Sequence, residues 1–239
     1  MAKPFLTAEW RKLVLLNYEV DPSILKEYVP FGTELDIWEG KCYMSLVGFM
    51  FLNTKVKGMK LPMHVNFEEV NLRFYVKHKT ADGEVKRGVT FLKEIVPKPI
   101  ITFVANKVYK EHYQTCAMSH LWDVKDNEMD IGYKWYIDNR ENLIVINSAK
   151  TPLEIKANSE EDFITEHYWG YTKVNDGKTS EYEVKHPSWK VYQINNAKID
   201  VDFGLTYGEE FKFLNSKQPD SVMLAEGSEI SVGNKRIIT

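Results

Sequence analysis

The chain has 239 residues, of which 44% are hydrophobic and 13% aromatic, a composition typical of a folded β-rich protein and far from that of disordered chains. The formal net charge of -3 gives no general attraction to a phosphate backbone, so no nucleic-acid partner is expected. The sequence contains no signal-peptide pattern and no apolar stretch of membrane-spanning length, so we predict no membrane partner. Its only two cysteines, Cys42 and Cys116, do not form a disulfide framework, and we therefore predict a cytoplasmic protein.

The first half of the chain reads as a short helix followed by strands. Asp21 and Pro22 predict the start of a helix in "DPSILKEYV", with Asp21 as its N-cap. The stretch "LDIWEGKCYMSLVGFMF" predicts a strand, a turn at Glu39-Gly40 and a long buried strand. Residues 65–96 then predict a hairpin whose turn contains Asp82-Gly83.

The second half adds two helices and further hairpins. The spacing of the apolar residues after Pro99 predicts a helix that ends near Lys110, and "SEEDFITEHY" predicts another with Ser159 as its N-cap. Hairpins are predicted around Asp176-Gly177 and in the tail "SVMLAEGSEISVG". No linker divides the chain, so we predict a single α+β domain over residues 1–239, mostly antiparallel β with a few short helices.

The stretch "FEEVNLRFYVK" has the clearest alternation in the sequence. One face of this predicted strand is apolar and belongs to a core: Val70, Leu72, Phe74 and Val76. The other face is polar and aromatic: Phe67, Glu69, Asn71, Arg73 and Tyr75. Such a face meets water in many antiparallel sheets, but in a closed barrel it would line a polar lumen that can orient a small ligand. The two large aromatic residues favour the lumen.

The partner strand "GVTFLKEIV" is predicted to place Val89, Phe91, Lys93 and Ile95 on one side. A lysine in an apolar row can become a nucleophilic amine when it is desolvated. The alternative, which we favour, is a lysine whose stem covers apolar surface while its ammonium group reaches water.

Several stretches together resemble the YqjF-like family of unknown function, a distant relative of acetoacetate decarboxylase. The resemblance is carried by Trp10, "DPSILKEYVPFGTELDIWEGKCYMSLVGFMF", "NFEEVNLRFYVKHKTADGEVKRGVTFLKEI", "ANKVYKEHY", "FITEHYWGY" and "VKHPSWKVY". It implies a barrel-like acetoacetate decarboxylase fold with a central cavity, and it implies no agreed activity.

The decarboxylase resemblance can be followed along the chain. Phe67 to Val70 resembles the Tyr-x-Glu-Val segment that carries a cavity glutamate in the decarboxylases, which places Glu69 in the cavity. Residues 105–107 resemble their Ala-Gly-Arg segment, and the positions that match the Schiff-base lysine and its neighbours are Tyr113, Gln114 and Thr115. The usual catalytic lysine is therefore absent, and any enzyme activity would be lyase-like without it. Lys107 and Lys110 are expected to face solvent or to pair with Glu111.

The preferred hypothesis is a cavity that binds or transforms a small, anionic organic molecule. Its candidate ligand-binding residues are Glu69, Arg73, Tyr109, His112, Tyr113 and Gln114. The alternative is a non-catalytic β-rich module with a filled core that mediates interaction or homo-oligomerisation. A third hypothesis uses Lys93 as a replacement amine. The scattered histidines, His167 among them, match no metal-binding spacing and are interpreted as structural, so neither a metal nor a cofactor is predicted.

Overall fold

The computed structural model describes residues 3–239, apart from the side chains of Val108 and Tyr109. The strands are β1 (Leu6–Glu19), β2 (Glu34–Leu35), β3 (Tyr43–Val56), β4 (Phe67–Lys79), β5 (Val85–Val96), β6 (Tyr113–Thr115), β7 (Met118–Val124), β8 (Glu128–Ile137), β9 (Arg140–Glu154), β10 (Trp169–Asn175), β11 (Lys178–Lys185), β12 (Lys190–Asp200), β13 (Ser221–Val232) and β14 (Arg236–Ile238). The helices are α1 (Pro22–Leu25), α2 (Pro99–Val104), the π-helix η1 (Ala105–Tyr109), α3 (Glu160–Thr165), α4 (Phe203–Tyr207) and the 3-10 helix η2 (Glu209–Asn215).

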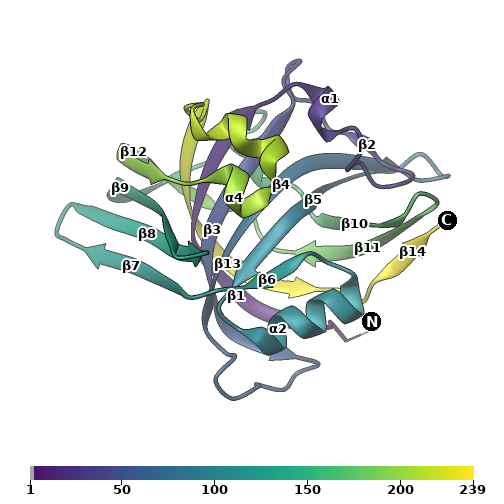
Figure 1. The fold of residues 1–239 in the computed structure, drawn as a ribbon, viewed down its shortest axis with the longest axis horizontal. Helices are drawn as coiled ribbons and strands as arrows, with labels where there is room; N and C mark the ends of the chain where they lie inside the picture. The colour runs from purple at the N-terminus through teal and green to yellow at the C-terminus, as the bar shows by residue number, and fades with distance from the viewer. Residues whose placement is uncertain (1–2) are drawn as a thin grey trace.

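Seven strands form a closed ring in the order β11, β10, β5, β4, β3, β1 and β13. The ring closes because β13 pairs with β1 on one side and with β11 on the other, where Val184 lies opposite Val232. Every pairing in the ring is antiparallel except that of β5 with β10. Strands β12, β9, β8 and β7 continue the sheet from β13 and project to the left in Figure 1. The predicted mostly antiparallel, barrel-like fold is confirmed.

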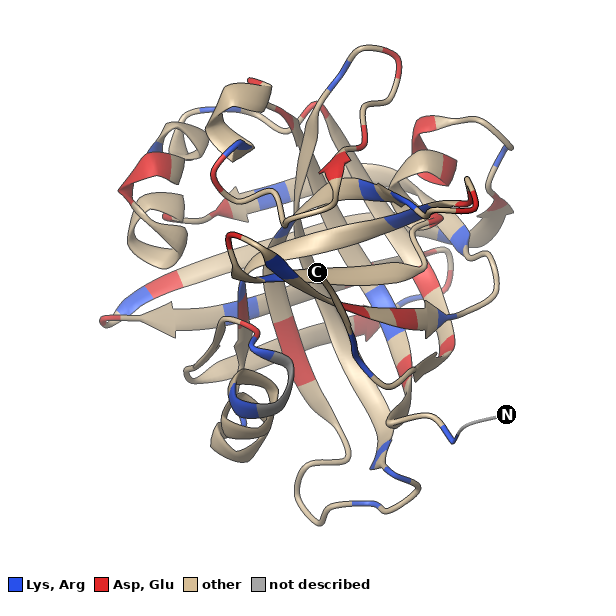
Figure 2. Ribbon diagram, turned by 90° about the vertical axis from the view of Figure 1, so that its right-hand side faces the viewer, with Lys and Arg blue, Asp and Glu red and all other residues tan. Residues whose placement is uncertain are grey.

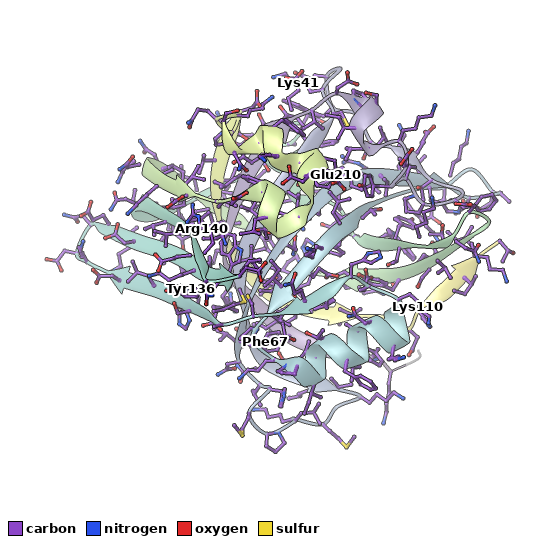
Figure 3. The ribbon with its side chains drawn as sticks, viewed as in Figure 1. Lys41, Phe67, Lys110, Tyr136, Arg140 and Glu210 are labelled. Carbon is purple, nitrogen blue, oxygen red and sulfur yellow. The ribbon has the colours of Figure 1, made fainter. Side chains whose placement is uncertain are left out.

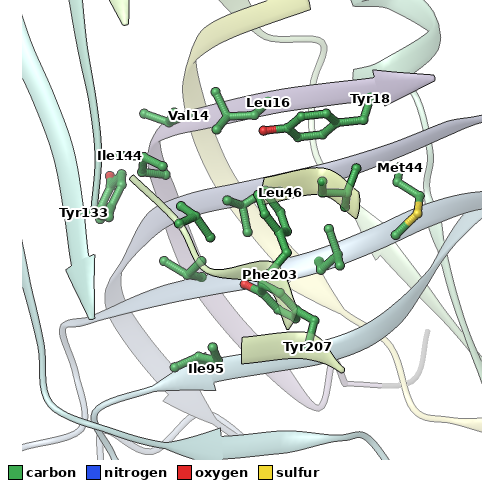
Figure 4. Packing of buried hydrophobic residues seen from close by; sticks show 14 of the residues in the cluster. Val14, Leu16, Tyr18, Met44, Leu46, Ile95, Tyr133, Ile144, Phe203 and Tyr207 are labelled. Atoms are coloured by element: carbon green, nitrogen blue, oxygen red, sulfur yellow. The ribbon is translucent and has the colours of Figure 1, made fainter. Parts of the chain in front are cut away.

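Two apolar clusters lie on opposite faces of the ring strands. The outer cluster contains the whole predicted apolar face of β4, and all four residues are fully buried: Val70, Leu72, Phe74 and Val76. Helix α4 covers this cluster, with the Phe203 ring 5.6 Å from that of Tyr18 (Figure 4). The second cluster lies inside the ring, where Phe49 of β3 and Phe67 of β4 belong to it. The polar-aromatic face of β4 therefore points inward.

The helix starts follow the predicted capping residues. The Asp21 carboxylate accepts a hydrogen bond from the Ser23 backbone N–H at 2.8 Å, and the Ser159 hydroxyl accepts one from the Asp162 backbone N–H at 3.2 Å. The predicted helix from Pro99 is α2 continued by η1, and it ends where Lys110 adopts a left-handed conformation with φ of 65°. These three predictions are confirmed.

Helix α4 and η2 were not predicted, although the sequence contains their signals. Asp202 caps α4 by accepting a hydrogen bond from the Leu205 backbone N–H at 3.0 Å. Phe203, Tyr207 and Phe211 are spaced four residues apart and are all buried against the outer cluster. This spacing is typical of the buried face of a helix.

The prediction of a hairpin in the tail is wrong. Residues 221–233 contain one uninterrupted strand, β13, rather than two. Gly227 has φ of 78°, but it lies inside this strand, paired with Arg11 of β1, rather than in a turn. A glycine inside a strand pattern can mark the close approach of another backbone as well as a turn.

Charge is distributed evenly over the molecule. In Figure 2, Lys and Arg residues alternate with Asp and Glu residues, and neither sign gathers on one part of the ribbon. Within residues 3–239, no helix is both long enough and apolar enough to cross a bilayer.

Candidate functional site

The ring of strands encloses a cavity of about 140 Å³. Most of its wall is apolar, with contributions from all seven ring strands and from α2; the aromatic residues among the apolar ones are Phe5, Trp10, Phe49, Phe51, Phe67, Phe91 and Trp169. The polar residues of the wall are Glu69, Asn71, Arg73, Glu94, Glu111, Tyr113, His167 and Tyr182. An apolar cavity with a few convergent polar groups is typical of a small-molecule site.

Strand β4 supplies the central polar row of this wall. It pairs with β3 without interruption from Phe67 to Phe74, so the alternation of its side chains is strict. Glu69 and Arg73 consequently both face the cavity and are 2% and 8% exposed. Within residues 3–239, the Arg73 side chain makes no hydrogen bond or ion pair, and its guanidinium carbon lies 5.6 Å from the centre of the Tyr75 ring.

Strand β5 does not present the predicted row. Its pairing with β4 shifts by one residue at Leu92, which is an extra residue between Phe91 and Lys93. After this bulge Glu94 faces the cavity, whereas Lys93 points to the opposite side and donates a hydrogen bond to the backbone carbonyl of Thr206 in α4. The hypothesis of Lys93 as a replacement amine in the cavity is therefore wrong.

The segment after η1 brings two more polar groups to the cavity. The Asn106 side chain holds this segment through both backbone groups of Tyr113, donating to its carbonyl at 3.0 Å and accepting from its N–H at 2.8 Å. Tyr113 then points its hydroxyl at Glu69, to whose Oε2 it donates at 3.2 Å. Glu111 is 6% exposed and accepts a hydrogen bond from the Thr172 hydroxyl at 2.7 Å.

The other predicted residues of this segment do not meet the cavity. The His112 side chain is exposed, and Gln114 is half-buried on β6; neither contributes to the described cavity wall. The Tyr109 side chain lies outside the described part of the structure. Lys107 and Lys110 are exposed, as expected, but Glu111 is directed inward rather than toward them (Figure 3 shows Lys110 at the end of the helix).

Three carboxyl groups share the polar end of the cavity. Burial raises the pKa of Glu69 and that of Glu111 from 4.5 to about 7. Burial, reinforced by the charges of the other two glutamates, raises the pKa of Glu94 well above its usual value. Oε2 of Glu94 and Oε2 of Glu111 have no hydrogen-bond partner among the described residues. These groups can therefore hold protons near neutral pH and donate them to a ligand.

His167 is a further wall residue and was interpreted from the sequence only as structural. Its Nε2 lies 3.1 Å from Oδ2 of Asp36, which also accepts a hydrogen bond from Arg87 at 2.7 Å. Burial lowers the pKa of His167 to about 4, so its ring is neutral at pH 7. Within residues 3–239, no cluster of His, Cys, Asp and Glu side chains has the arrangement of a metal site.

Comparison with known proteins assigns the family. The model of the DUF2071 family, described as an uncharacterized conserved protein, matches residues 7–229. This chain belongs to the DUF2071 family. The DUF2071 chain is also 25% identical to the uncharacterized protein YqjF of Bacillus subtilis (strain 168) over 226 residues, which cover 90% of this chain and 88% of YqjF. The predicted YqjF-like relationship is confirmed.

Solved structures of the same fold include enzymes. The enduracididine biosynthesis enzyme MppR with HEPES bound superposes with a TM-score of 0.70 at 9% identity, covering 100% of the DUF2071 chain and 89% of MppR. The acetoacetate decarboxylase of Legionella pneumophila gives a TM-score of 0.68 at 10% identity, covering 100% of this chain and 88% of the decarboxylase. These similarities establish an acetoacetate decarboxylase-like fold for the DUF2071 chain.

Proposed function

We propose that the ring cavity of this DUF2071 protein binds a small organic carboxylate with a short apolar body. The observation that carries the proposal is the Arg73 guanidinium, which is buried in the cavity wall without a hydrogen bond or ion pair to a described residue. A buried charge without a partner is strongly destabilising, and a carboxylate is the planar group that a guanidinium binds best.

The three nearby glutamates are compatible with an anionic ligand. Because burial raises the pKa values of Glu69 and Glu111 to about 7 and that of Glu94 well above its usual value, these groups are largely protonated below pH 7. In that state the polar end of the cavity carries the positive charge of Arg73, and the carboxyl groups act as neutral donors. The affinity for an anion is therefore expected to fall as the pH rises through about 7.

The cavity also limits the size of the ligand. Its volume of about 140 Å³ is close to the roughly 150 Å³ of an engineered apolar cavity that binds benzene. A carboxylate with a body of three to six carbon atoms, aliphatic or aromatic, matches this space. MppR, a structure of the same fold, has been solved in complex with pyruvate, which is a small carboxylate. No lysine lies in the described cavity wall, so turnover of such a ligand would not use a Schiff base on this chain.

The alternative of a filled core has less support. It requires side chains to occupy the interior of the ring, whereas the described side chains leave a cavity there. Homo-oligomerisation is independent of the cavity and remains a prediction.

Replacement of Arg73 tests the proposal. In isothermal titration calorimetry at pH 6, butyrate and benzoate are expected to bind the wild-type protein, and their uncharged primary amides to bind much more weakly. Arg73→Gln should weaken carboxylate binding about 100-fold, as expected for truncation of one partner of a buried ion pair. It should also leave the free protein as stable as the wild type or more so, because it removes an unpaired buried charge.

Arg140→Gln is the matched control, since Arg140 lies at the start of β9, outside the described cavity wall, and pairs with Asp200 (Figure 3). This variant should bind like the wild type. Equal binding of carboxylates and amides, or unchanged carboxylate binding by Arg73→Gln, would contradict the proposal.

A further inference from the structure

The strongest feature that the proposed function does not explain is the second nitrogen of His167. The imidazole is 7% exposed and lies against two aromatic rings, with its centre 4.7 Å from that of Tyr75 and 5.1 Å from that of Phe163. Its Nε2 is bonded to Asp36, whereas Nδ1 is buried and has no hydrogen-bond partner among the described residues. A buried polar atom without a partner destabilises the protein, and in native structures such an atom is a mark of functional sites.

The partner on Nε2 determines what Nδ1 can do. The hydrogen bonds from Arg87 and His167 to Asp36 keep this carboxyl group ionised, with a pKa below its usual value despite burial. An ionised carboxylate only accepts, so Nε2 must carry the proton. The neutral ring has one proton, and Nδ1 is therefore a bare acceptor. It can receive a hydrogen bond from a hydroxyl group but not from a carbonyl oxygen.

His167 and Arg73 both lie close to the same aromatic side chain. Both residues line the cavity, and both approach the Tyr75 ring, the guanidinium carbon to 5.6 Å and the imidazole centre to 4.7 Å. Tyr75 is itself fixed, because its hydroxyl is hydrogen-bonded to that of Ser45 at 2.6 Å. A ligand of a few carbon atoms that binds Arg73 through its carboxylate can therefore place a second group at His167.

We propose that His167, positioned by Asp36, accepts a hydrogen bond from a hydroxyl group that the ligand carries close to its carboxylate, so that the cavity selects 2- or 3-hydroxy acids over the corresponding unsubstituted and keto acids. This inference rests on the proposed function, since it assumes that Arg73 holds the carboxylate. A keto acid would bring a carbonyl lone pair against the lone pair of Nδ1, and an unsubstituted acid would leave Nδ1 unsatisfied.

Matched ligands on the wild-type protein provide the first test. Titration calorimetry at pH 6 compares butyrate with 2-hydroxybutyrate, 3-hydroxybutyrate and 2-oxobutyrate, which share one carbon skeleton. At least one hydroxy acid is expected to bind about tenfold more tightly than butyrate, in line with the usual contribution of a buried hydrogen bond. 2-Oxobutyrate is expected to bind no better than butyrate.

The variant His167→Phe removes the acceptor and keeps a flat ring. It should lose the tenfold preference for the hydroxy acid over butyrate, whatever its affinity for butyrate itself. His120→Gln, which alters an exposed histidine on β7 that pairs with Glu68, should retain that preference. Nitrogen-15 NMR of the wild-type protein is a second readout that needs no variant, because the Nδ1 resonance should move on addition of the hydroxy acid and not on addition of butyrate.

The two proposals fail in different ways. If butyrate binds the wild type in an Arg73-dependent manner but no hydroxy acid binds more tightly, the role of His167 is refuted and the carboxylate site stands. The same holds if His167→Phe keeps the preference, or if the Nδ1 resonance does not move. If none of the four acids binds, the proposed function itself is refuted, and with it this inference.

Discussion

The Glu111→Gln variant is expected to be more stable than the wild-type protein, by about 1 kcal/mol at pH 5 and by about 3 kcal/mol at pH 8.5. The physical reason is the burial of Glu111, which raises its pKa from 4.5 to about 7 in the folded protein. Between these two values the folded state holds a proton that the unfolded chain has released. The stabilisation by the protonated group is complete below pH 4.5 and is lost as the pH rises through 7. Glutamine mimics the protonated group at every pH and avoids the loss.

Glutamine can also preserve the local contacts of Glu111. The Thr172 hydroxyl donates to one carboxyl oxygen, and a glutamine carbonyl can accept the same hydrogen bond. Urea unfolding at pH 5 and pH 8.5 gives the two free energies, and Glu84→Gln, at the exposed end of the turn before β5, is the control that should change neither. A stability difference between Glu111→Gln and the wild type that does not grow with pH would contradict the prediction.

The wild-type protein should show the same effect in its own pH profile. Glu69 has a pKa raised to about 7 by burial as well, so both groups lower the stability as the pH rises from 4.5 to 7. Because the two charges develop in one cavity, with Glu94 beside them, ionisation of one makes ionisation of the next less favourable. A small carboxylate bound at Arg73 would be repelled by these negative charges. The protonation of the same glutamates therefore affects both the ligand affinity and the stability of the protein.

The sequence predicted the inward face of β4 because this strand alternates without interruption. Glu69 and Arg73 were placed in the cavity by a period of two, and the pairing of β4 with β3 keeps that period from Phe67 to Phe74. The same reasoning failed on β5, where the extra residue Leu92 shifts the phase by one. Glu94 was missed and Lys93 misplaced for this reason. A bulge depends on the pairing of two strands, so one strand's pattern does not reveal it.

The remaining site residues lie where no periodic pattern operates. Glu111 and His167 are in connections, one after η1 and one after α3, and their side chains are directed by distant partners, the hydroxyl of Thr172 and the carboxylate of Asp36. These contacts span 61 and 131 residues of sequence. The sequence alone predicted an ion-pairing glutamate at position 111 and a structural histidine at position 167. The burial of these two side chains, which the sequence does not reveal, is what places them in the cavity wall.

Gly227 in β13 is the second place where a single change should have a large effect. Gly227 has φ of 78°, and a Cβ atom added there would overlap the backbone carbonyl of Trp10 on β1 and approach Leu13 to 2.8 Å. Gly227 faces the irregular part of β1, whose pairing with β3 shifts between Arg11 and Val14, so that Trp10 and Leu13 both face the interior of the ring and line the cavity. A backbone atom cannot move aside as a flexible side chain can, so the strands would have to separate.

Gly227→Ala is therefore expected to destabilise the protein by about 4 kcal/mol. This loss combines the strain of an alanine in a left-handed conformation with the steric overlap of its Cβ atom against the paired strand β1. Gly83→Ala is the matched control, since Gly83 has φ of 90° in the turn between β4 and β5 but has no atom within 4 Å of an added Cβ. It should lose only the backbone contribution, about 1–2 kcal/mol. Urea unfolding of both variants isolates the contact with Trp10, and equal losses would show that Gly227 does not constrain β1. If the larger loss is found, the residual folded Gly227→Ala protein should also bind butyrate more weakly than Gly83→Ala does, because displacement of β1 moves Trp10 and Leu13 in the cavity wall.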